Sequence, residues 1–211
     1  SRLSVFIAFL FAFPATKAYG PFSDDFLKFL QENPKQNEFI IAAYQTYGDT
    51  GTFGGMKKDE KITRTPVIFI HGNSDSALYH NEYTTGWSEH VKYFMEHGYN
   101  SAELYGVSYG DRNLTNSLHN RISCANMLGI RRFIEAVIAY TKTEKVSVVA
   151  HSMGVSLARK AIQGGKVSLC FDLLSSSSDQ SVQIDSLIAI ASANYGMCLC
   201  LVDGLSSANA C

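Results

Sequence analysis

The sequence has 211 residues, of which 46% are hydrophobic and 18% are charged, and its formal net charge is −1. This length suits one domain with a sizeable hydrophobic core, and a near-zero charge without a basic run excludes a typical nucleic-acid-binding protein. Five cysteines favour an oxidising compartment, and their odd number leaves one without a partner inside this sequence. Because the cysteines lack both Cys-x-x-Cys spacing and a nearby histidine pair, we predict no metal site.

The first residues have the composition of a secretory signal peptide. Arg2 precedes an apolar run from Leu3 to Phe13, and small residues occur in the stretch from Ala15 to Ala18. We therefore expect residues 1–18 to be removed by cleavage after Ala18 and the mature protein to be secreted. The apolar run is shorter than the roughly 20 residues of a membrane span, and no later stretch is apolar enough to be a transmembrane span. An uncleaved anchor is the alternative.

Residues 19–60 are predicted to form an N-terminal helix and a glycine-rich lead-in to the main domain. The helix is expected from Phe22 to Leu30, with Ser23 as its N-cap. Glycines recur between residues 48 and 55, and this segment is expected to be a loop.

Residues 61–211 form the second predicted unit, in which apolar strands alternate with helical patterns. Such alternation predicts an α/β fold, with a parallel sheet flanked by helices and right-handed crossovers. Strands are expected at 66–71, 101–107, 145–150 and 184–191, and helices at 88–96, 122–141 and 153–163. The serine-rich segment 166–183 is predicted to be a flexible surface loop, with a moving lid as the alternative.

A five-residue motif, Ala-His-Ser-Met-Gly, extends from Ala150 to Gly154 between an apolar strand and a helical pattern. A sharp strand-to-helix turn lifts a nucleophilic serine clear of the sheet, and small residues two before and two after it tolerate the strained backbone. Ser152 is therefore the candidate nucleophile. The N–H group of Met153, at the start of the helix, is a candidate oxyanion donor. An N-cap serine without a catalytic role is the alternative.

A second motif begins at Thr65 and ends in His-Gly-Asn at Asn73. Its β-branched and aromatic residues predict a buried parallel strand that breaks into a loop at the glycine. In serine hydrolases of the α/β type, the loop at this point supplies the second oxyanion N–H group, which assigns that role to the backbone of Asn73. The residues predicted to support the two turns are His71, Gly72, Ala150, His151 and Gly154.

Together these motifs resemble the class 2 lipase family of secreted α/β-hydrolases. The resemblance is carried by the segments Val67 to Asn73, Lys145 to Gly154 and Ile184 to Asn194, and Ala150 matches the family's alanine at the first position of the turn. It implies an α/β-hydrolase core and the hydrolysis of acyl esters, lipid esters above all, through an acyl-enzyme on Ser152. The implied partners are a lipid ester and, transiently, a lipid–water interface. This chemistry requires no metal or organic cofactor.

The sequence departs from the family in the rest of the catalytic triad. In this fold the order along the chain is serine, then an acid, then histidine. None of the six histidines follows Ser152, and the acidic residues after it are Asp172, Asp179, Asp185 and Asp203. Only Asp203 lies beyond a predicted strand, and it comes earlier than the family's acid. We therefore expect the triad acid, the histidine and the last strands to be missing, which would leave a catalytically weak fragment.

Several alternatives to this interpretation stay open. An upstream histidine could in principle replace the missing base, but we predict that His71 and His151 support the turns and that the other four are structural or face solvent. A hydrolase of another substrate class, such as a thioesterase or a peptidase, is the first alternative function. A hydrolase-like binding protein without activity is the second.

Two surface features complete the predictions. The aromatic residues Tyr79, Tyr83 and Trp87 follow the His-Gly loop, and they either contribute to an acyl pocket or simply pack in the core and on the surface. Asn113 begins an Asn-Leu-Thr sequon, which makes it a candidate glycosylation site in a secreted protein.

Overall fold

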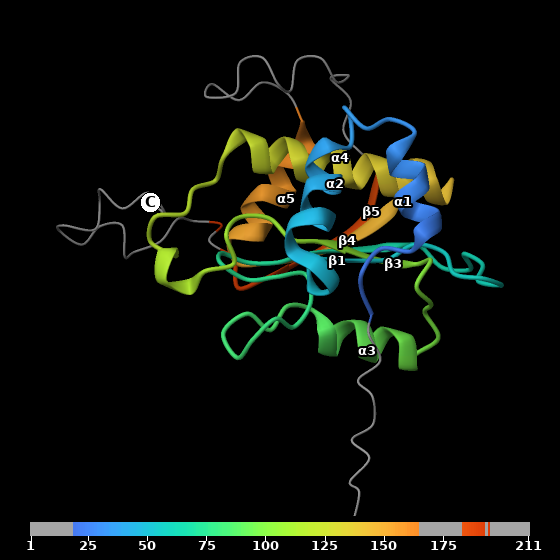
Figure 1. The fold of residues 1–211 in the computed structure, drawn as a ribbon, viewed down its shortest axis with the longest axis horizontal. Helices are drawn as coiled ribbons and strands as arrows, with labels where there is room; N and C mark the ends of the chain where they lie inside the picture. Colours follow the sequence, from blue (N-terminus) through green and yellow to red (C-terminus); the bar gives the residue numbers. More distant parts are fainter. Residues whose placement is uncertain (1–18, 165–182, 193, 195–211) are drawn as a thin grey trace, which may run out of the picture.

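The computed structural model describes residues 19–164, 183–192 and 194. They form three layers, in which a five-stranded sheet lies between helix α3 on one face and the other α-helices on the opposite face (Figure 1). The strands are β1 (Thr52–Phe53), β2 (Val67–Ile70), β3 (Leu104–Val107), β4 (Val146–His151) and β5 (Ile184–Ile190). The α-helices are α1 (Asp24–Gln31), α2 (Glu38–Tyr47), α3 (Ser88–Glu96), α4 (Cys124–Thr141) and α5 (Met153–Gln163), with short 3-10 helices η1 (Gly48–Thr50) and η2 (Leu114–Asn116).

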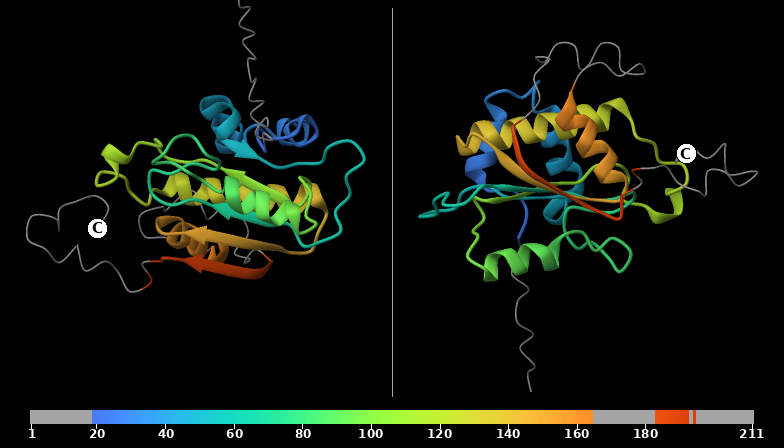
Figure 2. Two further views of the ribbon diagram at one scale, coloured as in Figure 1. Left: turned by 90° about the horizontal axis from the view of Figure 1, so that it is seen from below. Right: turned by 180° about the vertical axis from the view of Figure 1, so that it is seen from behind.

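The predicted alternation of strands and helices is confirmed for the parallel part of the sheet. The strand order is β1-β3-β2-β4-β5, with β2 parallel to both β3 and β4, and β4 parallel to β5 at the edge (Figure 2). All four residues of β2 are buried, because helices cover both faces of the sheet. Ile68 and Ile70 belong to the core under α4 and α5, whereas Val67 and Phe69 belong to the core against α3.

The prediction of a loop over residues 48–55 is wrong, because this segment contains strand β1. Thr52 pairs with Val107 and Phe53 with Gly106, and both pairs are antiparallel. A Cβ atom on Gly106 would lie 2.2 Å from the Phe53 ring, so glycine is what allows this pairing. The sheet is therefore mixed. Glycines in the local sequence indicate a turn, whereas the strand exists because of a partner far along the chain.

Helix α2 is a second element that the sequence pattern does not predict. Apolar residues occur on most sides of the segment from Glu38 to Tyr47, so no clear helical stripe identifies it, although Ile40 and Ala43 are buried in the structure. Helix α1 also packs against the main core, since the ring centres of Phe26 and Tyr140 in α4 lie 4.7 Å apart. Residues 19–60 thus contribute to the same hydrophobic core as the parallel strands.

Some sequence predictions lie outside the described residues. These are the signal peptide at residues 1–18, almost all of the serine-rich segment, and the acids Asp172, Asp179 and Asp203. Cys124, the first residue of α4, is disulfide-bonded. The other four cysteines lie outside the described ranges. Within those ranges, no helix has the length and apolar character to cross a membrane, and no cluster of three histidine, cysteine or acidic residues could hold a metal ion.

Candidate active site

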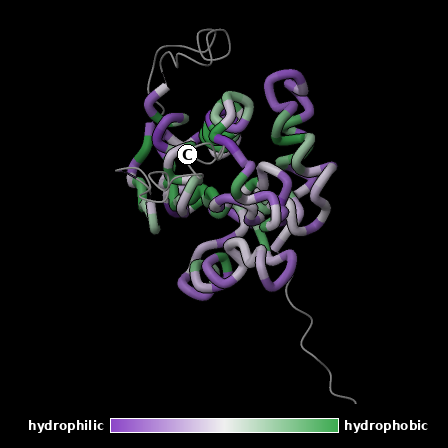
Figure 3. The backbone as a smooth tube through the Cα atoms, turned by 90° about the vertical axis from the view of Figure 1, so that its left-hand side faces the viewer, coloured by the Kyte–Doolittle hydropathy of each residue, from purple (hydrophilic) through white to green (hydrophobic). Residues whose placement is uncertain are grey.

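Ser152 occupies a sharp turn between the end of β4 and the start of α5. Its backbone has φ 51° and ψ −126°, in a region that residues other than glycine rarely adopt. The Ser152 N–H group donates to the Ile190 carbonyl at 2.9 Å, which ties the turn to the end of β5. The side chain is half-buried at the carboxyl end of the parallel strands, the end of the sheet that Figure 3 presents to the viewer. This geometry matches the strand-to-helix turn that the motif predicts.

The two predicted turns pack directly against each other through glycines. A Cβ atom on Gly154 would lie 2.2 Å from the His71 carbonyl oxygen, which is shorter than any real contact. A Cβ atom on Gly72 would lie 2.9 Å from Nδ1 of His151 and 3.2 Å from Cβ of Ser152. Gly72 has no positive φ, so close approach rather than a tight turn is the reason for glycine at this position. The structure therefore brings both motifs together around Ser152.

Ala150 supports the turn from inside the sheet. Its side chain is fully buried, and it pairs with Ile70 of β2 and with Ala189 of β5. A small side chain at this position lets α5 begin directly above the strand ends.

The two candidate oxyanion donors, Asn73 and Met153, line one cavity of about 210 Å³. Among the described residues, neither backbone N–H group has a hydrogen-bond acceptor. Met153 is the first residue of α5, where backbone N–H groups have no partner inside the helix and the helix dipole favours negative charge. Two residues whose N–H groups have no acceptor among the described residues thus line one cavity, and Met153 directly follows Ser152. Their role as oxyanion donors stays a prediction.

The side chain of Asn73 is held at both ends by the loop that follows β3. Its Nδ2 donates to the Ser117 carbonyl at 2.7 Å, and its Oδ1 accepts from Nδ2 of Asn120 at 2.9 Å. Asn120 also donates to Oγ of Ser74 at 2.9 Å. Because the backbone of Asn73 moves with its side chain, Asn120 restrains the orientation of the candidate donor. No local pattern in the sequence identifies Asn120, which is 47 residues away from Asn73.

Asp111 organises the same loop from its surface side. Its carboxylate accepts from Nδ2 of Asn116 at 2.8 Å and from the N–H group of Asn113 at 3.0 Å, and Nδ2 of Asn120 lies at 3.4 Å. Slight burial by itself raises the pKa of Asp111, but these hydrogen bonds outweigh it and hold the pKa below its usual value. Asp111 is therefore ionised near neutral pH and keeps Asn120 in place.

Comparison with known protein families settles which fold family this arrangement represents. The family model described as Lipase (class 2) matches residues 64–211, a range that includes both motifs and the cavity between them. This chain belongs to the class 2 lipase family. It is accordingly a hydrolase of the lipase and esterase type, and its sheet is consistent with an α/β-hydrolase-like fold. The matched range begins just before β2, so helices α1 and α2 and strand β1 of this class 2 lipase lie outside the match.

His71 of this class 2 lipase is a buried structural residue whose two ring nitrogens are both engaged. Nδ1 lies 2.7 Å from the Gly72 carbonyl, to which it donates, and Nε2 accepts from the N–H group of Tyr109 at 3.0 Å. The Tyr109 hydroxyl donates to the His71 carbonyl at 2.7 Å, and the two rings stack with centres 4.1 Å apart. With both nitrogens occupied, the ring is not available to take a proton from Ser152.

Acid is expected to destabilise the fold through His71. Burial lowers the pKa of His71 to about 4, and the neighbouring charges of Asp75, Arg112 and His151 have smaller effects. The unfolded chain takes up this proton near pH 6.5, so the stabilisation is complete above pH 6.5 and is lost as the pH falls towards 4. We expect a loss on the order of 3 kcal/mol in the free energy of unfolding from this residue.

Urea denaturation at pH 7 and pH 4.5 measures this effect in the wild type and in His71→Gln. The fall in unfolding free energy between the two pH values should be smaller in His71→Gln, while His97→Gln, which changes an exposed histidine, should behave like the wild type. A ring titration of His71 near pH 6.5 by NMR in the wild type would contradict the prediction.

None of the described histidines forms a hydrogen bond with the Ser152 hydroxyl. His151 is half-buried beside the turn, and the four remaining histidines, His80, His90, His97 and His119, are exposed. Asp185, the only described acidic residue after Ser152, is exposed and forms an ion pair with Lys145. Neither a base nor a triad acid is identified within the described part of the chain.

The aromatic residues after the His-Gly loop do not line the cavity. Trp87 is buried, with its ring centre 5.3 Å from that of Phe69, in the core against α3. Tyr79 and Tyr83 are 55% and 67% exposed, so packing and surface positions account for all three. Asn113 is exposed, and its Oδ1 accepts from the Thr115 hydroxyl at 2.7 Å. Its role as a glycosylation site stays a prediction.

Proposed function

We propose that this protein is a secreted serine hydrolase that cleaves lipid acyl esters through an acyl-enzyme on Ser152. One observation carries the proposal: Ser152 has a strained, positive-φ backbone beside two N–H groups, of Asn73 and Met153, that have no acceptor among the described residues. Membership in a lipase family supports an ester of a lipid as the substrate.

In the proposed mechanism, Oγ of Ser152 attacks the ester carbonyl while a general base accepts its proton. The carbonyl oxygen becomes an oxyanion, which receives hydrogen bonds from Asn73 N–H and Met153 N–H. The alcohol leaves after taking up a proton, and the acyl group stays on Ser152. Water then attacks the acyl-enzyme, releases the carboxylic acid and restores the serine hydroxyl.

A substrate panel tests this proposal against the alternative activities. The panel contains p-nitrophenyl esters with a series of acyl lengths. We expect each ester to have a higher kcat/KM than the thioester or anilide of the same acyl length. A fluorophosphonate probe should label the protein, and peptide mass spectrometry should locate the adduct on Ser152. A higher kcat/KM for the thioester or the anilide would instead assign another substrate class. The absence of both hydrolysis and labelling would favour a binding protein without activity.

A further inference from the structure

We propose that the cavity beside the oxyanion donors binds a phosphate group of the substrate, so that the preferred ester carries a phosphate a few atoms from the reacting carbonyl. Asn73 and Met153 lie on the cavity wall, and a group bound there is therefore adjacent to the carbonyl that these donors would hold. This inference rests on the proposed function, because it assigns a substrate class to the same site.

The walls of the cavity are rich in hydrogen-bonding and cationic side chains. In addition to Asn73 and Met153, the lining residues are Ser74, Tyr109, Gly110, His119, Asn120, Arg121, Ser123 and Asn126. None of these described lining residues is acidic, and the nearby carboxylate of Asp111, which lies 3.4 Å from Nδ2 of Asn120, is engaged by hydrogen bonds from Asn113 and Asn116. The side chains of Asn73, Asn120 and Tyr109 are already hydrogen-bonded within the protein. An acyl chain in this cavity would therefore remove water chiefly from His119, Arg121 and Asn126, at a cost of about 1–3 kcal/mol for each group left unsatisfied.

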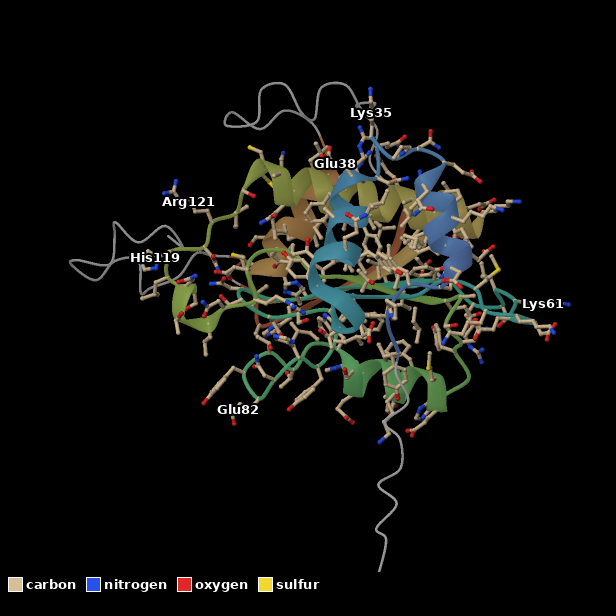
Figure 4. The ribbon with its side chains drawn as sticks, in the orientation of Figure 1. Lys35, Glu38, Lys61, Glu82, His119 and Arg121 are labelled. Atoms are coloured by element: carbon tan, nitrogen blue, oxygen red, sulfur yellow. The ribbon has the colours of Figure 1, made fainter. Side chains whose placement is uncertain are left out.

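Arg121 is the permanently charged residue among those that line this cavity, and its side chain extends outward into solvent (Figure 4). Its side chain is exposed, and among the described residues it has neither an ion-pair partner nor a hydrogen-bond partner. A guanidinium group stays charged at every relevant pH and binds phosphate through two parallel hydrogen bonds. His119 lies two positions earlier on the same loop, and both side chains extend from the end of the molecule where the parallel strands terminate (Figure 4).

Part of the cavity wall is preorganised for binding. Asn120 holds Asn73 and Ser74 through hydrogen bonds of 2.9 Å, and Asp111 in turn accepts from the loop that carries Asn120. These side chains are thus held in place before a phosphate binds, which lowers the conformational entropy lost on binding. Helices α4 and α5 also begin at this cavity, so their dipoles add to the positive potential supplied by Arg121.

Binding of glycerol 3-phosphate to the full chain tests the site without requiring activity. We expect saturable chemical-shift changes at the Asn73, Asn120 and Arg121 amides in ¹⁵N NMR spectra, and no such changes with glycerol. Arg121→Gln should weaken binding by about tenfold or more, because a charged hydrogen-bonded contact contributes about 1.5–3 kcal/mol. Lys35→Gln removes the same charge at a different end of the molecule and should leave binding unchanged (Figure 4).

The second test compares the hydrolysis of phosphorylated and uncharged esters. We expect kcat/KM for an acylated glycerol phosphate to exceed that for the uncharged acylglycerol of the same chain length by about tenfold, with the preference lost in Arg121→Gln mainly through KM. The acylated glycerol phosphate is tested with a butyryl and with a palmitoyl chain. A preference for the butyryl compound indicates a soluble phosphate ester as the substrate, and a preference for the palmitoyl compound indicates a phospholipid.

The two tests distinguish the possible failures. The phosphate site is wrong if glycerol 3-phosphate causes no localised shifts at tens of millimolar, or if Arg121→Gln and Lys35→Gln weaken binding equally. Equal hydrolysis of the phosphorylated and uncharged esters also overturns it. Localised binding without hydrolysis of any ester would leave the site standing and reject the proposed function instead.

Discussion

Replacement of Ser152 by alanine is expected to lower kcat for ester hydrolysis on the order of 10⁴-fold and to abolish fluorophosphonate labelling. The change removes the only atom proposed to form a covalent bond with the acyl group. Loss of the nucleophile costs about 10⁶-fold in kcat in a serine hydrolase with an intact triad, and we expect a smaller loss here because no base is identified among the described residues. The hydrogen bond from the residue-152 N–H group to the Ile190 carbonyl uses the backbone, so alanine retains it. The fold should therefore survive, with a melting temperature within a few degrees of the wild type.

Ser156→Ala is the matched control, because Ser156 lies one turn further along α5 and takes no part in the proposed site. It should retain both the wild-type hydrolysis rate and the labelling. If Ser152→Ala hydrolyses esters as fast as Ser156→Ala, the nucleophile lies elsewhere, and the acyl-enzyme mechanism on this residue is wrong.

Replacement of Gly154 by alanine is expected to destabilise the fold by about 3 kcal/mol or more. The new Cβ atom would lie 2.2 Å from the His71 carbonyl oxygen and 2.9 Å from the Ile70 carbonyl oxygen, both on the backbone at the end of β2. No rotamer change can relieve a contact with main-chain atoms, so α5 must move away from the sheet. Because α5 carries Met153, the separation of the two oxyanion donors should change at the same time.

Urea denaturation measures this loss of stability, with Gly110→Ala as the control. Gly110 has φ 76° and open space around its Cβ position, so alanine there meets only the strain of a positive φ, about 1 kcal/mol. A Gly154→Ala protein within 1 kcal/mol of the wild type would show that the two turns are not in rigid contact, and the proposed geometry around Ser152 would be incorrect.

The sequence by itself determines the features that depend on short stretches of chain. The apolar run in β2 predicts a strand buried on both faces, and the four-residue burial pattern confirms this. The Ala-His-Ser-Met-Gly motif predicts a strand-to-helix turn at Ser152, and the turn is present. Both features are visible in sequence because neighbouring residues set the local backbone geometry and the periodicity of burial. The resemblance to the class 2 lipase family is carried by the same short motifs, and the family match over residues 64–211 confirms it.

The tertiary structure alone decides the features that depend on residues far apart in the chain. Strand β1 exists because its residues pair with β3, and Asn120 restrains Asn73 only because a loop folds back across the carboxyl end of the sheet. The same folding gives His71 a partner for each ring nitrogen and forms a polar cavity lined by the candidate oxyanion donors. No local pattern encodes these contacts, since each depends on where packing of the whole core places two distant segments.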